Sequence, residues 1–328
     1  MLTEETSVLV TGATGFVGSH LVERLVGSGV RVRALVRSTS DVSRLERLGV
    51  ERTVGSLEDA GALVRALEGV EVVFHLAALT YARREADLER VNATGTRVVV
   101  EAARRAGVRR LVYLSSLAAA GPSLDGRPVT AEEPARPLTA YGRSKLAGER
   151  ACLESSGALE SVILRAPAVY GPRDREMLRF FRYAARGVLP VPGGPERRLQ
   201  MVHARDLAEG LARAAAAPRA RGIYHVAEPR DYTWTEIVGH IARAVGRRAL
   251  RVRVPRPLVR VAGATSEWGA ALVGRTTIFN RDKVRELLAP GWLCETETLR
   301  KDAGFTARIA LPDGLEETAT WYRANGWL

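Results

Sequence analysis

Short apolar runs alternate with amphipathic helical patterns along the first half of the chain. Most of the runs are too uniformly apolar to expose one face to water, which is typical of strands covered on both sides by helices. Repeated strand-helix-strand units around a parallel sheet are therefore predicted. The expected strands are residues 7–10, 30–36, 51–55, 71–77, 109–115 and 160–166.

Helical patterns fill the intervals between these runs. The stretch 85–106 is the longest, and Gly107 follows it as a stop signal. Another helix is expected over 139–157. The remaining helices are expected to begin near Phe16, Asp41 and Asp59.

Beyond Tyr170 the regular alternation weakens, because clusters of Pro and Gly interrupt it. A helix over 204–217 and a strand over 223–227 are expected to return to the sheet. The prediction is an α/β fold with a Rossmann-type doubly wound parallel sheet and a smaller, interleaved C-terminal substrate-binding region. Residues 1–172, completed by about 199–230, would form the dinucleotide-binding domain, while 173–198 and 231–328 would mainly build the substrate-binding region.

The chain has 328 residues and a formal net charge of +12, which raises the question of a nucleic-acid partner. Its arginines are scattered through every segment, and no basic run interleaved with aromatic residues forms a groove-binding pattern. A globular protein without a nucleic-acid partner is therefore expected.

Three further features describe the expected setting. Cys152 and Cys294 lie far apart, and the N-terminus lacks the basic start of a signal peptide, so a reduced, cytoplasmic location is expected. The stretch 258–273 is fairly apolar, but it contains Arg260 and Glu267 and indicates an amphipathic or core helix rather than a membrane span. The five histidines have no Cys or carboxylate partner at ligand spacing, so no metal site is expected.

A glycine-rich turn follows the first expected strand. In TGATGFVG, the residues Gly12, Gly15 and Gly18 allow a tight turn that brings backbone amides close to a pyrophosphate, and the helix beginning at Phe16 directs its positive N-terminus at that anion. The position directly after a strand and before a helix is the context that dinucleotide binding requires.

Arg37 follows the second expected strand, where NAD enzymes usually place an acidic residue for the ribose 2′-hydroxyl. A guanidinium there matches a 2′-phosphate instead, because its planar fork pairs with phosphate oxygens. NADP(H) is therefore favoured over NAD(H).

Tyr141 and Lys145 lie four residues apart in an expected helix, hence on one face about one turn apart. A nearby ammonium and an oxidised nicotinamide would both lower the pKa of the phenol, so Tyr141 is the candidate acid/base. Ser115 and Ser116 leave the end of a strand, where one hydroxyl could bind the reacting oxygen.

Several motifs together resemble the extended short-chain dehydrogenase/reductase superfamily, in the NAD-dependent epimerase/dehydratase group. They are TGATGFVG at 11–18, HLAA at 75–78, Asn92 in RVNATGT, SS at 115–116, YGRSK at 141–145 and RAPAVYGP at 165–172. The resemblance covers essentially the whole chain.

The resemblance implies roles for these residues. Tyr141 would be the catalytic acid/base, Lys145 would hold the nicotinamide ribose and lower the pKa of the tyrosine, and Ser116, five positions before Gly121, would orient the substrate oxygen. Asn92 would tie helix and sheet together. Ser56 stands where relatives commonly have Asp beside the adenine, so the Leu57 backbone would replace that contact. The other implied cofactor contacts are Gly12, Thr14, Gly15, Phe16, Val17, Gly18, Arg37, Leu76, Ala77, Ala78, Pro167, Ala168 and Val169.

The pattern RxPxxYGP is similar to the 3β-hydroxysteroid dehydrogenase and dihydroflavonol reductase branch, whose substrates are largely apolar. Reversible reduction of a ketone on an apolar small molecule is therefore expected, together with a possible homodimer through helices 85–106 and 139–157. Two alternatives stay open. Arg197 or Arg198 keeps a nucleotide-sugar epimerase or dehydratase in view, and some superfamily members bind the dinucleotide without turnover as sensors or assembly proteins.

Overall fold

The computed structural model describes residues 2–155, 157, 159–274 and 276–328. Within these residues, seven strands form one parallel sheet: β1 (Ser7–Thr11), β2 (Arg31–Val36), β3 (Glu51–Val54), β4 (Val72–His75), β5 (Arg110–Ser116), β6 (Glu160–Ala166) and β11 (Gly222–His225). Their order is β11-β6-β5-β4-β1-β2-β3. Because the chain first builds β2 and β3 on one side of β1 and then crosses to β4 on the other, a crevice forms at the carboxyl ends of β1 and β4, where doubly wound sheets bind ligands.

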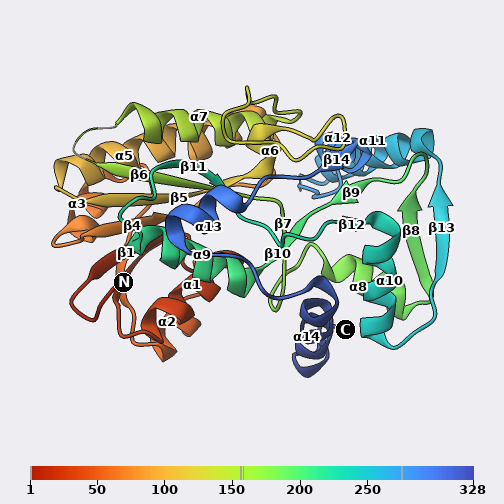
Figure 1. Cartoon of the computed structure of the whole chain (residues 1–328), viewed down its shortest axis with the longest axis horizontal. Coiled ribbons are helices and arrows are strands. Elements are labelled where there is room, and N and C mark those ends of the chain that lie inside the picture. The colour runs from red at the N-terminus through yellow and green to blue at the C-terminus, as the bar shows by residue number, and fades with distance from the viewer. Residues whose placement is uncertain (1, 156, 158, 275) are drawn as a thin grey trace.

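Helices cover both faces of this sheet (Figure 1). One face carries α1 (Phe16–Val26) and α9 (Ala204–Ala216), which contact each other, and the short α2 (Ser43–Arg47) follows β2. The other face carries α3 (Ala60–Leu67), α5 (Gly95–Arg105) and α7 (Ala140–Glu154). A separate buried apolar cluster lies under each layer, as expected for strands without a solvent face. The predicted Rossmann-type fold is confirmed.

The expected single helix over 85–106 contains an irregular turn. It begins as α4 (Glu85–Leu88), continues as a π-helical turn η1 (Glu89–Thr94) and becomes regular again in α5. Such turns are frequent at functional sites. Here the turn carries Asn92. Its Oδ1 accepts a hydrogen bond from the backbone N of Leu79 at 2.8 Å, and its Nδ2 donates to the carbonyl O of Leu79 at 2.8 Å and to the Ser144 hydroxyl at 2.9 Å. Asn92 therefore ties this helix to the segment after β4 and to α7.

The second region lies at the carboxyl side of the sheet and fills the right half of Figure 1. Its core includes Phe181, Tyr232, Ile237, Leu315 and Tyr322. Its strands are β7 (Ala168–Tyr170), β8 (Val188–Pro192), β9 (Arg198–Leu199), β10 (Met201–His203), β12 (Tyr232–Thr233), β13 (Leu250–Val254) and β14 (Gly291–Trp292). Its helices are α8 (Leu178–Ala185), α10 (Trp234–Val245), α11 (Arg256–Leu272), α12 (Arg281–Leu288) and α14 (Leu311–Ala324).

One C-terminal segment lies with the sheet although the sequence places it in the substrate-binding range. Leu299 of α13 (Glu297–Ala303), Phe305 and Ala307 share a buried cluster with α1, α9 and the strands. The carboxylate of Asp206 in α9 accepts from the backbone N of Arg308 and of Ile309. The interleaving of the two regions therefore extends further along the chain than the sequence pattern indicates.

Among the described residues, no helix is both long enough and apolar enough to cross a bilayer. The fairly apolar stretch over 258–273 forms most of α11, which lies on the surface of the second region.

Candidate active site

Two glycines at the junction of β1 and α1 leave no space for a side chain. Gly12 has φ = 75°, and a Cβ atom there would lie 2.7 Å from the N of Ala77. A Cβ atom on Gly18 would lie 2.0 Å from the carbonyl O of Gly12. Glycine at these positions therefore lets α1 begin directly against the loop.

The N-terminus of α1 is free to receive an anion. Gly15 is its cap residue and provides no side-chain hydrogen bond, and the first turn contains no acidic residue. The first N–H groups of a helix lack intrahelical partners and carry partial positive charge. The residues of this loop thus fit a pyrophosphate, and they would hold that part of a dinucleotide.

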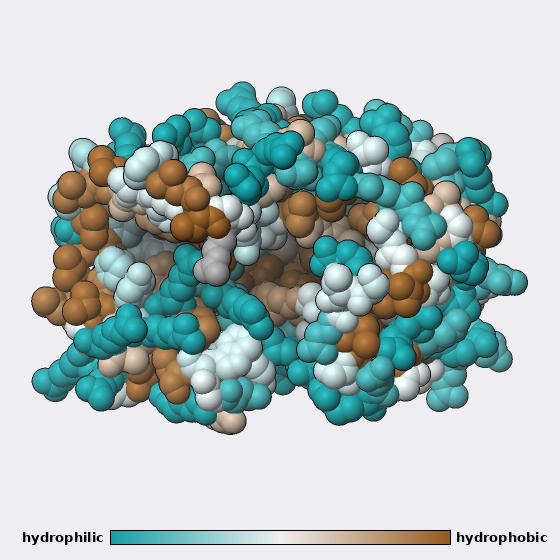
Figure 2. Space-filling view, turned by 180° about the vertical axis from the view of Figure 1, so that it is seen from behind, coloured by the Kyte–Doolittle hydropathy of each residue, from teal (hydrophilic) through white to brown (hydrophobic). Residues whose placement is uncertain are grey.

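A cleft of about 1730 Å³ extends from this loop into the second region. Figure 2 shows it as a deep hollow in the middle of the molecule with a hydrophobic floor. The volume exceeds the few hundred to about 1000 Å³ of pockets for a single drug-sized ligand, so it has room for a dinucleotide and a second molecule. The lining includes the predicted contacts Gly12, Thr14, Gly15, Phe16, Val17, Gly18, Leu76, Ala78, Pro167, Ala168 and Val169.

Four predicted cofactor contacts lie outside the cleft lining. Ala77 is one of them: its backbone lies against Gly12, and its N–H donates to Thr11 Oγ1. Arg37 is exposed directly after β2. The Ser56 hydroxyl accepts a hydrogen bond from the backbone N of Glu58, which stabilises the turn after β3. The Leu57 side chain packs against Gly95 of α5, where an added Cβ atom would lie 3.1 Å from Leu57 Cδ1. Arg37, Ser56 and Leu57 follow β2 and β3 at the sheet edge that carries the phosphate loop.

The two serines at the end of β5 have different surroundings. Ser115 is buried, and its hydroxyl donates to Glu149. Ser116 lines the cleft and caps the short α6 (Leu117–Ala120), where its Oγ accepts from the N of Ala118 at 3.1 Å. Because Ser116 uses an oxygen lone pair for this cap, its hydroxyl proton stays available to a molecule in the cleft.

Tyr141 stands in the first turn of α7 and lines the same part of the cleft. Burial raises the pKa of its phenol to about 12, and the hydroxyl of Ser116 acts in the opposite direction. Among the protein's own groups, burial therefore outweighs the opposing effect of Ser116 on this pKa. The expected decrease through Lys145 and an oxidised nicotinamide stays a prediction. A phenol with this pKa keeps its proton at neutral pH, so the proton that a reduced carbonyl oxygen requires is present on Tyr141.

Lys145 is buried one turn further along α7 and also lines the cleft. Its Nζ donates to the carbonyl O of Leu114 at 2.7 Å and lies 4.0 Å from the centre of the Tyr113 ring. Burial lowers the pKa of Lys145 to about 7, and the charge of Glu149 limits that decrease. The amine is thus directed at the carbonyl O of Leu114, near the end of β5.

A buried ion pair below this helix was not anticipated from the sequence. Both carboxylate oxygens of Glu149 accept from Arg165, at 2.9 Å from Nε and at 2.7 Å from a terminal nitrogen. Glu149 lies one helical turn after Lys145, and Arg165 is the last residue but one of β6, just before the cleft-lining Ala166 and Pro167. The pair therefore fastens α7 to β6 beneath the site. The spacing of Lys145 and Glu149 was the available signal, but Arg165 could not be assigned as the partner without the fold.

Helix α12 caps the helix that carries Tyr141. Asp282 accepts from the N of Ala140 at 2.9 Å, and Glu286 accepts from the Thr139 hydroxyl at 3.2 Å. Acidic groups at a helix N-terminus are stabilising. Lys283 on the same helix forms ion pairs with Glu176 and Glu286 at 3.5 Å. Sequence reasoning missed α12 because its partners are separated from it by more than a hundred residues.

Beyond these groups the lining of the cleft combines apolar and charged side chains. The apolar ones include Met177, Phe180, Val191, Trp234, Val259 and Phe279. Arg197 is one of the charged lining residues; it is buried and donates to the backbone O of Pro192 and Gly193. Arg198 is exposed and pairs with Asp231.

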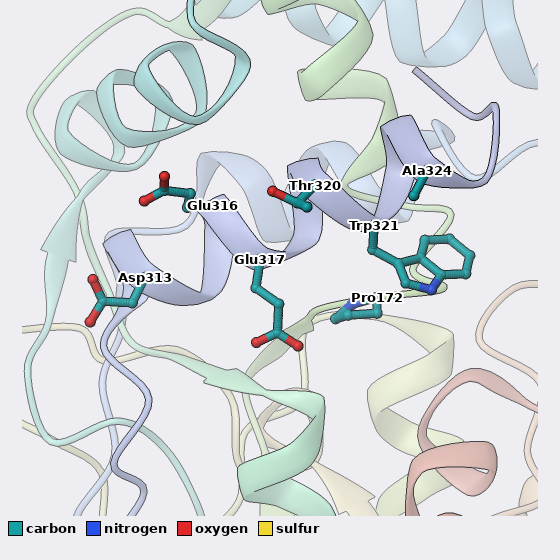
Figure 3. A pocket seen from close by; sticks show the side chains of 7 residues that line it. All are labelled: Pro172, Asp313, Glu316, Glu317, Thr320, Trp321 and Ala324. Atoms are coloured by element: carbon teal, nitrogen blue, oxygen red, sulfur yellow. The ribbon is translucent and has the colours of Figure 1, made fainter.

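A smaller hollow of about 510 Å³ lies along α14 (Figure 3). It carries Asp313, Glu316 and Glu317, whose carboxylates point in different directions. Three acidic groups would repel a phosphate, so this hollow does not suit the dinucleotide. In the described part of the chain, no group of His, Cys, Asp and Glu side chains is arranged to hold a metal ion.

Comparison with known proteins agrees with this geometry. The chain is 38% identical over 324 residues to a ceramide reductase of Caulobacter vibrioides (strain NA1000 / CB15N), covering 98% of this chain and 96% of that protein. It is 28% identical to a 4-hydroxy-2-methyl-3-oxo-4-farnesyl-3,4-dihydroquinoline-1-oxide ketoreductase of Stigmatella aurantiaca, covering 94% of each chain.

A solved structure with the same fold contains a nicotinamide dinucleotide. The structure of MoeE5 in complex with UDP-glucose and NAD has a TM-score of 0.78 and 28% identity, and the match covers 97% of this chain and 99% of that one. The model of the NAD dependent epimerase/dehydratase family matches residues 8–227, which carry the phosphate loop, Ser116, Tyr141 and Lys145. The chain therefore belongs to the NAD dependent epimerase/dehydratase family.

Proposed function

We propose that the protein is an NADP(H)-dependent reductase that reversibly reduces a ketone on a largely apolar molecule. The observation that carries this proposal is the group of apolar side chains that line the cleft beyond Tyr141, which includes Met177, Phe180 and Val259. Burial of apolar surface is the main favourable term that such a group offers, and it selects a hydrocarbon over a sugar. The names of the relatives, a ceramide reductase and a farnesyl-quinoline ketoreductase, support the same class of substrate.

The bound nicotinamide would supply the hydride. The protein's part is to place and protonate the carbonyl. Tyr141, protonated because burial raises its pKa to about 12, donates its proton to the ketone oxygen. Ser116 donates a second hydrogen bond to the same oxygen. Lys145 would hold the nicotinamide ribose, and its hydrogen bond to the carbonyl O of Leu114 sets the position of its amine.

The preference for NADP(H) rests on Arg37. It is exposed at the carboxyl end of β2, where a ribose 2′-phosphate would be neutralised by a guanidinium. Arg44 and Arg47 of α2 line the neighbouring part of the cleft and add positive charge there. The cofactor contacts of Ser56 and Leu57 are part of the same proposal.

One observation favours a second candidate function. Arg197 is buried in the cleft wall and, within the described chain, its side chain bonds only backbone carbonyls, so it could meet an anionic group of a bound molecule. A nucleotide-sugar epimerase would use such an arginine for a diphosphate.

The two functions differ in whether cofactor is consumed. Purified protein is incubated with NADPH and either long-chain 3-ketones or nucleotide sugars. We expect NADPH oxidation with the ketones alone. Redox-neutral conversion of a nucleotide sugar would establish the epimerase instead, and NADPH binding without any turnover would indicate a sensor.

The Tyr141→Phe variant tests the assigned chemistry. Loss of the proton donor is expected to lower kcat by about 10²- to 10⁴-fold, while the Kd for NADPH measured by fluorescence titration stays unchanged. Undiminished turnover of the ketone by this variant would refute the role of Tyr141.

A further inference from the structure

The second region exposes an apolar surface beside the mouth of the cleft. We call it the apolar edge, and it consists of Leu250, Val252, Leu258, Val261, Trp268 and Leu272. Figure 2 shows hydrophobic side chains gathered over α11 and β13 at one side of the molecule, next to the central hollow. Single exposed apolar residues are ordinary, but a contiguous group of them marks an interaction surface.

The helix α11 has two apolar faces with different partners. Leu258, Val261, Trp268 and Leu272 recur at the three- and four-residue spacing that places them on one side of the helix, and each is more than half exposed. The neighbouring positions Val259 and Ala262 line the cleft. A single helix therefore separates the interior of the cleft from whatever covers the apolar edge.

The β8-β13 ribbon continues this surface toward the cleft. Val188 pairs with Leu250, and both are exposed, whereas Pro192 pairs with Val254 and both line the cleft. Because alternate residues of a strand share a face, these four side chains follow one face of the ribbon. An apolar path thus leads from the outer surface to the substrate side of the site.

Strong positive charge surrounds the apolar edge. Residues 237–272, which span the apolar edge, contain seven arginines and one acidic residue, Glu267. Six of these arginines are exposed: Arg243, Arg247, Arg248, Arg251, Arg253 and Arg260. An amphipathic helix with arginines beside its apolar face is suited to the boundary between lipid headgroups and acyl chains, and anionic lipids attract the charge.

We propose that the apolar edge binds an anionic lipid bilayer, with α11 lying in the interface and the cleft opening toward the membrane. A second copy of the chain fits this surface less well, because a symmetric contact would bring arginines against arginines. The binding itself does not depend on the reaction, whereas entry of an apolar ketone from the bilayer rests on the proposed function.

Sedimentation with vesicles tests the binding. We expect the full-length protein to bind vesicles of phosphatidylcholine mixed with phosphatidylglycerol better than vesicles of phosphatidylcholine alone, and added salt to weaken the binding. The double variant Leu258→Ser and Leu272→Ser is expected to lower the partition coefficient about tenfold or more. Reversal of charge in Arg248→Glu with Arg253→Glu is expected to abolish the preference for anionic vesicles.

A matched control comes from exposed apolar residues elsewhere. Val64 on α3 and Leu124 are 69% and 58% exposed, close to 67% for Leu272 and 58% for Leu258. The double variant Val64→Ser and Leu124→Ser is expected to bind vesicles as the wild type does. Equal binding by the Leu258/Leu272 variant, or equal binding to neutral and anionic vesicles, would overturn the proposal.

Two further measurements separate other outcomes. Gel filtration of the wild type and the Leu258/Leu272 variant should give the same oligomeric state, and a dimer lost in the variant would make the edge an interface between copies and overturn membrane binding. With a short-chain ketone dissolved in buffer, the Leu258/Leu272 and Val64/Leu124 double variants should both keep the kcat/KM of the wild type. With a ketone embedded in anionic vesicles, only the Leu258/Leu272 variant should lose turnover. Absence of turnover by every form would refute the proposed function and leave the vesicle-binding result standing.

Discussion

Replacement of Gly18 by Ala offers a direct test of the phosphate loop. The added methyl carbon would lie 2.0 Å from the carbonyl O of Gly12 and 2.8 Å from its carbonyl carbon. Non-bonded carbon atoms prefer about 3.5 to 4.0 Å, and the atoms in the way belong to the backbone, so no side chain can rotate to relieve the contact. The start of α1 must therefore move away from the loop by about 1 Å or more.

The movement should reduce both the affinity for the cofactor and the stability of the fold. Overpacking of this kind costs about 1–3 kcal/mol of stability. Hydrogen bonds from backbone N–H groups to a charged phosphate contribute about 1.5–3 kcal/mol each, and loss of one corresponds to about 10- to 100-fold weaker binding. We expect the Kd for NADPH to increase by that factor, with a moderate decrease in the free energy of unfolding.

Fluorescence titration with NADPH and urea unfolding measure the two effects. Gly269→Ala in α11 is the matched control, because a Cβ atom there would meet no neighbouring group of the described residues within 4 Å, and alanine stabilises a helix by up to about 1 kcal/mol relative to glycine. It should bind NADPH normally and be as stable as the wild type or more so. Normal NADPH affinity in the Gly18 variant would refute the assignment of this loop to the pyrophosphate.

Three other predictions concern Arg37 and the groups around Lys145. In Arg37→Asp, the ratio of the Kd for NADP+ to that for NAD+ should increase about 10- to 100-fold, because the 2′-phosphate loses a charged partner; an unchanged ratio in titrations with both cofactors would contradict the NADP(H) preference. Burial lowers the pKa of Lys145 from 10.5 to about 7, so between these values the unfolded chain binds more protons and the contribution of Lys145 to stability increases with pH. Urea unfolding at pH 7 and pH 9 should therefore show the wild type gaining stability relative to Lys145→Met at the higher pH, and parallel curves would rule out the shifted pKa. Glu149→Gln removes the charge opposite buried Arg165 and should lower the free energy of unfolding by about 3–5 kcal/mol. The control Glu101→Gln loses only a surface pair with Arg104 and Arg105 and should leave the urea midpoint nearly unchanged. Equal effects of the two variants on urea unfolding would show that the buried pair does not support α7.

The elements of the sheet could be predicted closely from the sequence because their signals are local. The expected strand over 160–166 is β6 with the same bounds, and the helix after the glycine loop begins at Phe16 as expected. The order of glycines, Ser116, Tyr141 and Lys145 along the chain was sufficient to indicate the family and a dinucleotide site. These features depend on residue spacing within one turn or one strand, which is fully contained in the sequence.

Other properties of the site depend on which distant residues meet. The pKa of Tyr141 is set by burial, the N-terminus of α7 is capped by Asp282 from 142 residues along the chain, and Glu149 finds Arg165 on another element. The outward direction of Leu258 and Trp268 on α11 likewise follows from the inward packing of Val259 and Gly263. The sequence by itself thus determined the elements and the order of the chemical groups. Only the tertiary structure decided their electrostatic surroundings and the exposed face of α11, because burial and long-range contacts arise when separate segments exclude water from each other.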